Sequence, residues 1–478
     1  MRQLFGTDGI RGVAGEYPLD QKTVFAIGRA LGQRLAAREQ AARSTPASAL
    51  RLRSGQAPAL AGGPSGVVVG QDTRQSSAWI GAALAAGLES AQVQVVSAGV
   101  ITTPGIAYLT RANKFVAGIV ISASHNPWQD NGIKIFGADG YKLSDELEHE
   151  IEADIFAHIE QLAAASHNVV PDCRMLPGDG VLREQYAEWL AGLVSDDDFS
   201  RLRVLVDCAN GAASTIAPLV FHDCGISADF LHIEPNGRNI NAGCGALYPE
   251  HVAQAVAAAA GRYDLGITFD GDADRAMFAD PGGHVLNGDA VLLLAARDMK
   301  THVRLHNDMV VATTMSNMGL EAALKRSGIT MLRAPVGDKY VLEQMLKTGA
   351  TLGGEQSGHI LFRDIDTTTG DGILTALRVL EVMARTGKPL AELVADMKVF
   401  PQEIKNVHVR EKRPFEQLPA VMESIRRAER ELEGSGRVVV RYSGTEKLAR
   451  VMIEAESERE MRRHTDAIAE AIQQAIGV

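Results

Sequence analysis

Apolar and polar positions alternate along the chain in blocks that predict a repeated unit of strand and helix. Apolar strands run into polar, helix-starting residues at VVVGQDTRQSS from residue 67, at VLVDCANGAAS from residue 204 and at VVATTMSNMGL from residue 310. In each unit a second short strand follows the helix, and a third apolar or glycine-rich run then ends in a polar loop. This alternation is typical of parallel sheets covered by helices, in which ligands bind beyond the carboxyl ends of the strands. The three polar loops are therefore expected to share one cleft.

Two parts of the chain depart from this pattern. Residues 21–38 have apolar positions at helical spacing, but residues 39–66 are rich in Ala, Ser, Pro and Gly without any period, which predicts an inserted surface loop. Near residue 396 the helix-rich pattern stops, and RVVVRYSGTEKLARVMIEAE predicts two strands around a turn, followed by a helix from Ser457. These changes predict four domains: 1–176 with the insertion 39–66, then 177–280, 281–396 and 397–478.

Composition places the chain among ordinary soluble proteins of several domains. Its 478 residues include 46% hydrophobic and 22% charged residues, which is close to the globular average. A net charge of −11 argues against nucleic acid or an anionic membrane as a partner. Neither a secretion signal nor a run of about 20 apolar residues is evident, so we expect a cytoplasmic protein. The four cysteines form no C-x-x-C pair, which predicts reduced thiols and no zinc site.

The loop after the apolar run LGITF carries three carboxylates at alternate positions, Asp270, Asp272 and Asp274. Like charges at one strand end repel each other unless a cation binds them, and hard oxygen ligands favour Mg²⁺. An EF-hand would need Gly and Glu where Arg275 and Pro281 stand. The loop therefore predicts one Mg²⁺ site with a position left for a phosphoryl oxygen. The alternative is a solvated acidic turn.

The loop SASHNP, directly after the apolar run GIVI, places Ser124 beside His125. A hydrolase elbow would read G-x-S-x-G, and the flanking Ala123 and His125 do not fit it. A Ser-His-Asp hydrolase is therefore disfavoured. A turn in which Ser124 and Asn126 cap backbone groups is an equally good interpretation of this loop alone.

The loop GGEQSGH sets Glu355, Ser357 and His359 at alternate positions between glycines. Carboxylate and hydroxyl groups of this kind suit hydrogen bonds to sugar hydroxyls, and the glycines permit close approach of the backbone. Taken alone, the loop fits a glycine-rich turn with one capping Glu at least as well.

The stretch RYSGTEKLAR combines guanidinium forks, hydroxyls and backbone N–H groups, which together suit a phosphate monoester. A hairpin turn with exposed arginines is the alternative. The candidate ligands of a phosphate are Arg441, Ser443, Gly444, Thr445 and Arg450.

Together, SASHNP, DGDADR, GEQSGH and RYSGTE resemble the α-D-phosphohexomutases, in this order and over nearly the whole chain. The resemblance implies three related α/β domains with mixed, mostly parallel sheets and a smaller carboxy-terminal α+β domain around a central cleft. Within this family of isomerases, the opening LFGTDGIRG, the stretch DNGIKIF and Gln356 are most similar to members that act on amino-sugar phosphates.

The resemblance also implies the roles of the four loops. Ser124 corresponds to the family's phosphoserine and, with the three aspartates, to its metal ligands. Glu355 and Ser357 correspond to its sugar-reading loop. Its phosphate clamp corresponds to Arg441, Ser443, Gly444, Thr445 and Arg450. Phosphorylated Ser124 would convert glucosamine 6-phosphate through glucosamine 1,6-bisphosphate into glucosamine 1-phosphate, which supplies UDP-N-acetylglucosamine and cell-wall synthesis.

Phosphoryl transfer needs positioning and charge neutralisation, and Arg11, Arg275 and Lys134 offer positive charge. An attacking hydroxyl must also lose its proton, so a base is required. Lys134 and His359 are the candidates, and we favour Lys134 on its family position. His125 is expected to shape the turn and steady the phosphate.

Several alternatives stay open at this point. The sugar could be glucose or mannose, and the chain could be a monomer or a homodimer. A phosphatase with Asp270 as nucleophile would leave SASHNP and RYSGTE unexplained, and a non-catalytic regulator would bind a sugar phosphate without isomerising it. Lys447 stands where most relatives have Pro, which adds a positive charge and permits a less rigid phosphate loop.

Overall fold

The computed structural model describes residues 4–6, 8–44, 66–164, 177–194, 198–365, 367–443 and 447–478. They form two compact units. Unit 1 comprises Met1–Thr313 and Arg333–Leu393, and unit 2 comprises Thr314–Leu332 and Val394–Val478.

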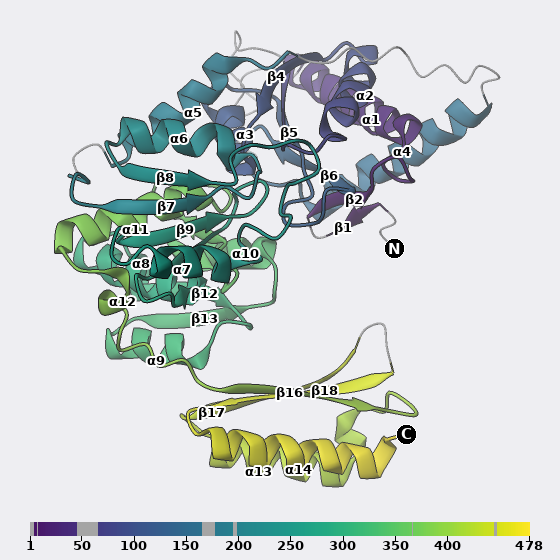
Figure 1. Ribbon diagram of the computed structural model, residues 1–478. Coiled ribbons are helices and arrows are strands. Elements are labelled where there is room, and N and C mark those ends of the chain that lie inside the picture. The colour runs from purple at the N-terminus through teal and green to yellow at the C-terminus, as the bar shows by residue number, and fades with distance from the viewer. Residues whose placement is uncertain are drawn as a thin grey trace. The chain divides into compact units, whose positions relative to one another are not determined.

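The first sheet of unit 1 has six strands in the order β1-β2-β6-β5-β3-β4 (Figure 1). Its strands are β1 (Phe5–Gly6), β2 (Gly9–Val13), β3 (Gly66–Gln71), β4 (Gln94–Val100), β5 (Ala117–Ile121) and β6 (Asp130–Gly137). The associated helices are α1 (Gln21–Ser44), α2 (Ser77–Ser90), α3 (Thr103–Ala112) and α4 (Asp145–Ala164). The parallel strands β4, β3 and β5 form the core, and β6, β2 and β1 are added antiparallel. Antiparallel pairing thus has a larger share than the alternation of elements alone predicts.

Helices α1 and α2 approach each other closely because glycines face each other at their contact. A Cβ atom on Gly28 would lie 2.1 Å from the carbonyl oxygen of Leu84, and one on Gly87 would lie 2.3 Å from that of Phe25. No side chain fits at either position. The apolar residues of α1 and α2 join those of β3 and β5 in one core, which holds the end of β5 rigidly.

The second sheet of unit 1 repeats the parallel core with antiparallel additions, in the order β11-β10-β9-β7-β8. Its strands are β7 (Arg203–Asp207), β8 (Ser227–Leu231), β9 (Leu265–Phe269), β10 (Ala276–Ala279) and β11 (Val285–Leu286). The helices of this part are α5 (Gly180–Gly192), α6 (Ala213–Asp223) and α7 (Pro249–Ala258). Apolar residues of α7 pack against β7 and β10. All five residues of β9 are buried, as expected of a central strand.

In the third region, β12 (Met309–Thr313) pairs in parallel with β14 (Leu352–Gly354), and β14 pairs antiparallel with β15 (Ile360–Phe362). Strand β13 (Thr330–Ala334) lies at the boundary between the two units. The helices here are α8 (Gly288–Thr301), α9 (Met318–Arg326), α10 (Asp338–Thr348), α11 (Gly372–Thr386) and α12 (Leu390–Leu393). The three related α/β units predicted from the sequence are therefore present.

Unit 2 contains the small α+β domain, an antiparallel sheet of order β16-β18-β17. Its elements are β16 (Gln402–His408), α13 (Pro419–Glu431), β17 (Gly436–Tyr442), β18 (Leu448–Ala455) and α14 (Glu458–Ile476). Apolar faces of α13 and α14 share a core with β16 and β18. Ser457 caps α14 by accepting a hydrogen bond from the N–H of Glu460, so the predicted helix start is confirmed.

The predicted loop over residues 39–66 is wrong at its ends. Helix α1 continues to Ser44, and Gly66 already belongs to β3. The stretch EQAAR consists of strong helix formers, which extend the helix without an apolar period, and the helix ends two residues before Pro46. The remainder of the predicted loop, residues 45–65, lies outside the described residues.

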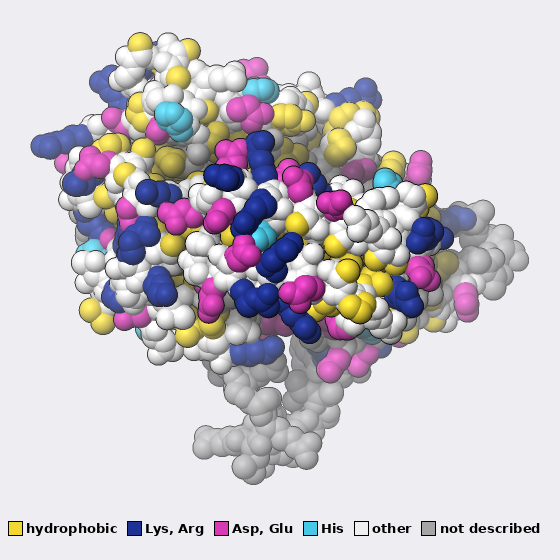
Figure 2. All heavy atoms as spheres, turned by 90° about the horizontal axis from the view of Figure 1, so that it is seen from below, with side chains coloured by type: hydrophobic (Ala, Val, Ile, Leu, Met, Phe, Trp, Pro, Cys, Tyr) yellow, Lys and Arg dark blue, Asp and Glu magenta, His cyan; other side chains and the backbone are white. Residues whose placement is uncertain are grey.

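The described residues show surface charges of both signs (Figure 2) and free thiols. On the face drawn in Figure 2, Lys and Arg side chains are interspersed with Asp and Glu side chains. None of the helices in the described part of the chain has the length and apolar character that a bilayer crossing requires. Cys208 and Cys244 are buried and Cys224 is half-buried, all as free thiols, while Cys173 lies outside the described residues.

Candidate functional site

Ser124 lies at the end of β5 in a backbone conformation that serine rarely adopts. Its φ is 51°, in the left-handed region, and its side chain is buried. The Oγ–H of Ser124 donates a hydrogen bond to Asp270 Oδ2 at 2.5 Å, and His125 Nδ1 is 3.2 Å from Ser124 Oγ. The structure therefore brings two of the predicted loops together at this hydroxyl.

Gly271 explains how the two loops come so close. A Cβ atom at this position would lie 2.4 Å from the carbonyl oxygen of Ser124. Only glycine fits there, so Gly271, the second residue of the DGDADR motif, allows this loop to contact the serine turn.

Asp270, Asp272 and Asp274 follow the buried strand β9, and one carboxylate oxygen of each lies within 4.8 Å of the others. All three side chains are buried. Among the described residues, Asp272 Oδ1 and Asp274 Oδ1 have no hydrogen-bond partner. Burial, and then the charges of Asp274 and Asp272, raise the pKa of Asp270 well above its usual value. These unsatisfied oxygens and this repulsion fit the hard ligand set of a divalent cation such as Mg²⁺.

Lys134, on β6, lies buried against the same carboxylates. Its Nζ is 2.8 Å from Asp272 Oδ2, 3.4 Å from Asp274 Oδ2 and 3.2 Å from Asp8 Oδ2. Burial by itself would lower the pKa of Lys134, but the three carboxylates outweigh it and raise the pKa well above its ordinary value. In this arrangement Lys134 is an ammonium group that neutralises the aspartates.

A second layer of charged residues, which the sequence analysis missed, continues this network. Lys142 Nζ donates to Asp8 Oδ1 at 2.5 Å and to Asp338 Oδ2 at 2.6 Å. Burial would raise the pKa of Asp338, but Lys142 and His359 hold it below the usual value. Asp8 belongs to the opening motif LFGTDGIRG, which was quoted for the resemblance without a role for this residue. Lys142 and Asp338 stand in no motif that could have indicated them.

The third loop also reaches this centre. His359 Nδ1 is 3.6 Å from Asp274 Oδ1, and its Nε2 is 3.7 Å from Asp338 Oδ2. Burial opposes protonation, yet Asp274 and then Asp338 raise the pKa of His359 above its ordinary value. Glu355 accepts a hydrogen bond from the N–H of Gly337 at 3.0 Å. Ser357 Oγ lies 3.5 Å from Glu355 Oε2, so both predicted sugar ligands share one loop.

Two arginines and one histidine complete the predicted catalytic set. Arg11 forms an ion pair with Asp8, and Arg275 Nε lies 3.7 Å from Asp274 Oδ1. Burial, followed by the nearby positive charges of Arg275 and Arg11, lowers the pKa of His125. Two arginines thus place positive charge near His125, next to the carboxylates that face Ser124.

Two further residues, also missed from the sequence, hold the serine turn in place. Arg74, which is fully buried, donates to the carbonyl oxygens of Ser124 at 2.9 Å and Asn126 at 2.8 Å. Asn241 Nδ2 donates to the carbonyl oxygens of the same two residues, at 2.9 and 3.1 Å. The position of Arg74 in QDTR, just after a buried strand, was the only sequence signal for either residue.

The predicted phosphate ligands belong to unit 2. Arg441 on β17 and Arg450 on β18 stand directly opposite each other in the antiparallel register, so their side chains leave the same face. Ser443 is buried, and its carbonyl oxygen accepts a hydrogen bond from Lys412 Nζ at 2.6 Å. Like charges directly opposite destabilise a strand pair, and an anion between them would relieve this. Gly444 and Thr445 lie outside the described residues.

Comparison with known proteins places these four loops in one family. Four phosphoglucomutase/phosphomannomutase domain descriptions match the chain in order: alpha/beta/alpha domain I over residues 37–162, domain II over 184–283, domain III over 287–400 and the C-terminal domain over 404–471. A solved structure of a phosphoglucomutase/phosphomannomutase family protein from Burkholderia thailandensis has a TM-score of 0.73 at 23% identity and covers 99% of both chains. The Aspergillus fumigatus N-acetylphosphoglucosamine mutase, solved in complex with GlcNAc-6P and magnesium, has a TM-score of 0.63 at 18% identity, covering 100% of this chain and 96% of that chain. These two likenesses show the fold.

Other relatives share much more of their sequence with this chain than these two solved structures do. A phosphoglucosamine mutase from Koribacter versatilis is 68% identical over 479 residues, which cover 100% of this chain and 98% of that protein. One from Solibacter usitatus is 48% identical over 476 residues, covering 100% of this chain and 99% of that protein. With its four matched domains and these full-length relatives, the chain belongs to the phosphoglucomutase/phosphomannomutase family, the α-D-phosphohexomutases, and within it to the phosphoglucosamine mutases.

Proposed function

We propose that the chain interconverts glucosamine 6-phosphate and glucosamine 1-phosphate, with Ser124 as the phosphoryl carrier. The full-length relative at 68% identity, itself a phosphoglucosamine mutase, supports this substrate. The carrying observation is that Ser124 Oγ lies 2.5 Å from a carboxylate of the buried aspartate triad. A phosphate on this oxygen would sit beside the cation that the triad is built to hold.

The reaction consists of two phosphoryl transfers. A sugar hydroxyl attacks the phosphorus of phosphorylated Ser124, a new O–P bond forms, and the bond from phosphorus to Ser124 Oγ breaks. The resulting glucosamine 1,6-bisphosphate turns round and returns its other phosphoryl group to Ser124. The strained backbone of Ser124, fixed by Arg74 and Asn241, keeps its oxygen in one position through both transfers.

One Mg²⁺ ion fits the ligand set of Asp270, Asp272, Asp274 and the phosphorylated Ser124. When bound, it supplies positive charge that stabilises the phosphoryl group in transfer. Arg275 and Arg11 add charge from the protein itself. The unsatisfied oxygens of Asp272 and Asp274 support this assignment.

In this proposal Lys134 accepts the proton that the reacting sugar hydroxyl loses and donates a proton to the serine oxygen that leaves. His359 is the second candidate for this role. As an ammonium group, Lys134 is ready to donate a proton to the departing serine oxygen. A cation held by Asp270, Asp272 and Asp274 would offset carboxylate charges that raise the pKa of Lys134, and would thereby allow Lys134 to accept the sugar proton. His125 lies next to Ser124 Oγ and steadies the phosphate.

Substrate binding falls to the two remaining loops. Glu355 and Ser357 would bind sugar hydroxyls. The substrate phosphate would be bound by Arg441, Ser443 and Arg450, together with Gly444 and Thr445.

We further propose the division into domains 1–176, 177–280, 281–396 and 397–478, which the four matched ranges support. A cytoplasmic enzyme that supplies UDP-N-acetylglucosamine synthesis is the matching cellular role.

A coupled assay with the 6-phosphates of glucosamine, glucose and mannose tests the proposal. We expect glucosamine 6-phosphate to have the highest kcat/KM, and Ser124→Ala to lose roughly 10⁴-fold or more in kcat because the carrier oxygen is gone. Ser90→Ala, an exposed serine on α2, is the matched control and should turn over normally. Turnover by Ser124→Ala close to that of the wild type would refute the carrier role, and a preference for glucose or mannose would refute the substrate.

A further inference from the structure

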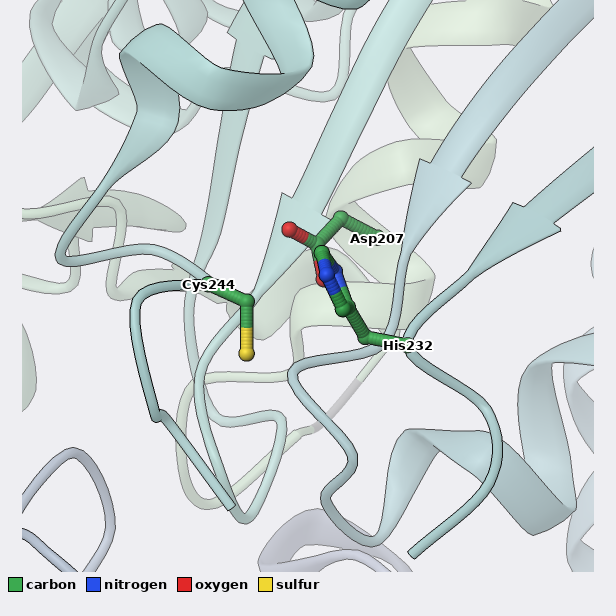
Figure 3. A group of neighbouring side chains, drawn as sticks. All are labelled: Asp207, His232 and Cys244. Carbon is green, nitrogen blue, oxygen red and sulfur yellow. The ribbon is translucent and has the colours of Figure 1, made fainter. Parts of the chain in front are cut away.

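A group of three potential metal ligands lies outside the carboxylate centre, at the ends of β7 and β8. Asp207 is the last residue of β7, His232 directly follows β8, and Cys244 comes from the loop that leads to α7. One ligand atom of each lies within 4.8 Å of those of the other two. Figure 3 shows the His232 ring against the Asp207 carboxylate, with Cys244 beside them on a separate segment. Residues far apart in the sequence thus supply one sulfur, one nitrogen and one oxygen.

Backbone N–H groups hold the carboxylate of Asp207 by hydrogen bonds, as is usual for carboxylates that bind metals. Its Oδ1 accepts the N–H of Ala209 at 2.8 Å, and its Oδ2 accepts the N–H of Gly245 at 3.0 Å. His232 Nδ1 lies 2.9 Å from Oδ1. A carboxylate has about four lone-pair positions, so the two backbone bonds fix its orientation and leave room for a cation.

The position of His232 is also fixed by the backbone. Its φ is 51°, in the left-handed region, and its carbonyl oxygen accepts a hydrogen bond from the N–H of Asn210 at 2.7 Å. The side chain is 39% exposed, whereas those of Asp207 and Cys244 are buried. A cation can therefore enter from solvent past the imidazole.

We propose that Asp207, His232 and Cys244 form a second cation site, which selects a borderline-soft divalent ion of the Zn²⁺ type. Thiolate and imidazole ligands favour Zn²⁺ over Mg²⁺, whereas the all-carboxylate triad has the opposite preference. Zn²⁺ bonds of about 2.0 to 2.3 Å place tetrahedral ligands about 3.3 to 3.8 Å apart, so the three atoms, which lie within 4.8 Å of one another, need to converge by no more than about 1.5 Å. Water would take the fourth position.

The site has a direct structural connection to the serine turn. The loop between His232 and Cys244 contains Asn241, which donates to the carbonyl oxygen of Ser124. The N–H of Asn241 donates to the carbonyl oxygen of Ala209, next to the Asp207 strand end. A bound cation would hold this loop closed on itself, and we expect it to raise the thermal midpoint of unfolding.

Cobalt substitution identifies the ligands directly. The full-length protein is loaded with one equivalent of Co²⁺ in excess Mg²⁺, which keeps the carboxylate triad occupied. We expect a sulfur-to-cobalt charge-transfer band in the near ultraviolet, which Cys244→Ser abolishes. His232→Gln, at a side chain that is 39% exposed, should weaken Co²⁺ and Zn²⁺ binding by about 10- to 100-fold in calorimetry.

Matched cysteine variants control for thiolate ligation elsewhere. Cys224→Ser changes a half-buried thiol at the end of α6 and should keep the band, and so should Cys173→Ser. The absence of a band in the wild type overturns the proposal. A band that survives Cys244→Ser, or that disappears in either control, places the thiolate elsewhere and overturns it as well. If Cys244→Ser does not fold, unchanged Zn²⁺ affinity of His232→Gln has the same consequence.

Discussion

Charged side chains are arranged in opposite ways in two regions of the molecule. One is the carboxylate centre of unit 1, formed by Asp270, Asp272, Asp274 and Lys134, and the other is the arginine hairpin of unit 2, which carries Arg441 and Arg450. In the centre, Lys134 and the aspartates are buried and every ammonium group faces a carboxylate. In the hairpin, Arg441 is exposed and faces Arg450, a residue of the same charge, across two strands. Buried opposite charges fix atoms in one geometry, which suits the chemical step. Like charges on one face of the sheet, with Arg441 exposed and Arg450 half-buried, gain from an incoming anion, which suits capture of a phosphate.

The energetic consequences differ accordingly. Removing one partner of a buried ion pair leaves an uncompensated charge and typically costs about 3 to 5 kcal/mol. Exposed charges contribute about 0 to 1 kcal/mol to stability, so their removal mainly affects ligand binding. Substitutions in the centre should therefore alter both kcat and stability, and those in the hairpin should alter KM.

The largest effect is expected for Lys134→Met. Loss of the proton donor and acceptor should lower kcat by about 10²- to 10⁴-fold. Without the ammonium group the aspartates repel one another, so the free energy of unfolding should fall by several kcal/mol, and Mg²⁺ should restore part of it. Steady-state kinetics and denaturant titrations with and without Mg²⁺ measure both effects. Lys388→Met, at an exposed lysine, is the control, and near-normal turnover of Lys134→Met would refute its role.

Asp272→Asn removes one carboxylate charge but keeps the shape and the acceptor for Lys134 and Thr103. We expect the Mg²⁺ concentration for half-maximal activity to rise by about 10- to 100-fold. Kinetic titration with Mg²⁺ measures the shift. Asp229→Asn, an exposed aspartate on β8, should leave the titration unchanged. An Mg²⁺ dependence of Asp272→Asn equal to that of the wild type would exclude Asp272 as a ligand.

Arg441→Gln tests the other side of the comparison. Loss of a charge-assisted bond to phosphate should raise KM by about 10-fold or more with little change in kcat. Stability should not fall, because the repulsion with Arg450 is removed as well. Arg459→Gln, exposed at the start of α14, is the control. A fall in kcat at unchanged KM would contradict a capture role.

The smallest effect concerns stability alone. Burial raises the pKa of Asp371, which caps α11, to about 6, despite hydrogen bonds from Leu374 and Tyr186. Because this pKa lies above that of the unfolded chain, the folded state binds the proton more tightly. The stabilisation is complete below about pH 4 and is lost as the pH rises through 6. Asp371→Asn should remove this pH dependence, on the order of 2 kcal/mol, in denaturant titrations from pH 4 to 7. A wild-type profile that does not differ from that of the variant would contradict the raised pKa.

Most of the fold and the core of the site could be predicted because each signal is contiguous in the sequence. The three aspartates after β9 and Ser124 after β5 follow buried strands, whose ends a sheet brings to one edge. Asp8, Lys142 and Asp338 could not be found in this way. Each is a common polar residue by itself, and only the folded chain places Lys142 Nζ 2.5 Å from Asp8 Oδ1 and 2.6 Å from Asp338 Oδ2.

The cluster of Asp207, His232 and Cys244 could not be predicted from a sequence motif either. The absence of a C-x-x-C pair predicted no zinc site, since short spacing is the usual signal for such ligands. The ends of β7 and β8 bring the three residues together over sequence distances that no motif describes. Residues 39–44 show the opposite case. Their composition favours a helix, but they lack an apolar period, so the sequence analysis assigned them to a loop although they belong to α1.

Peptide mass spectrometry of the phosphorylated enzyme tests the central claim most directly. The protein is treated with a hexose 1,6-bisphosphate in Mg²⁺, digested and analysed before and after a short incubation with glucosamine 6-phosphate. We predict phosphate on the peptide that contains Ser124, its transfer to the sugar during the incubation, and no phosphate on Asp270. Full turnover by enzyme without phosphate on Ser124, or phosphate found on Asp270, would contradict the account.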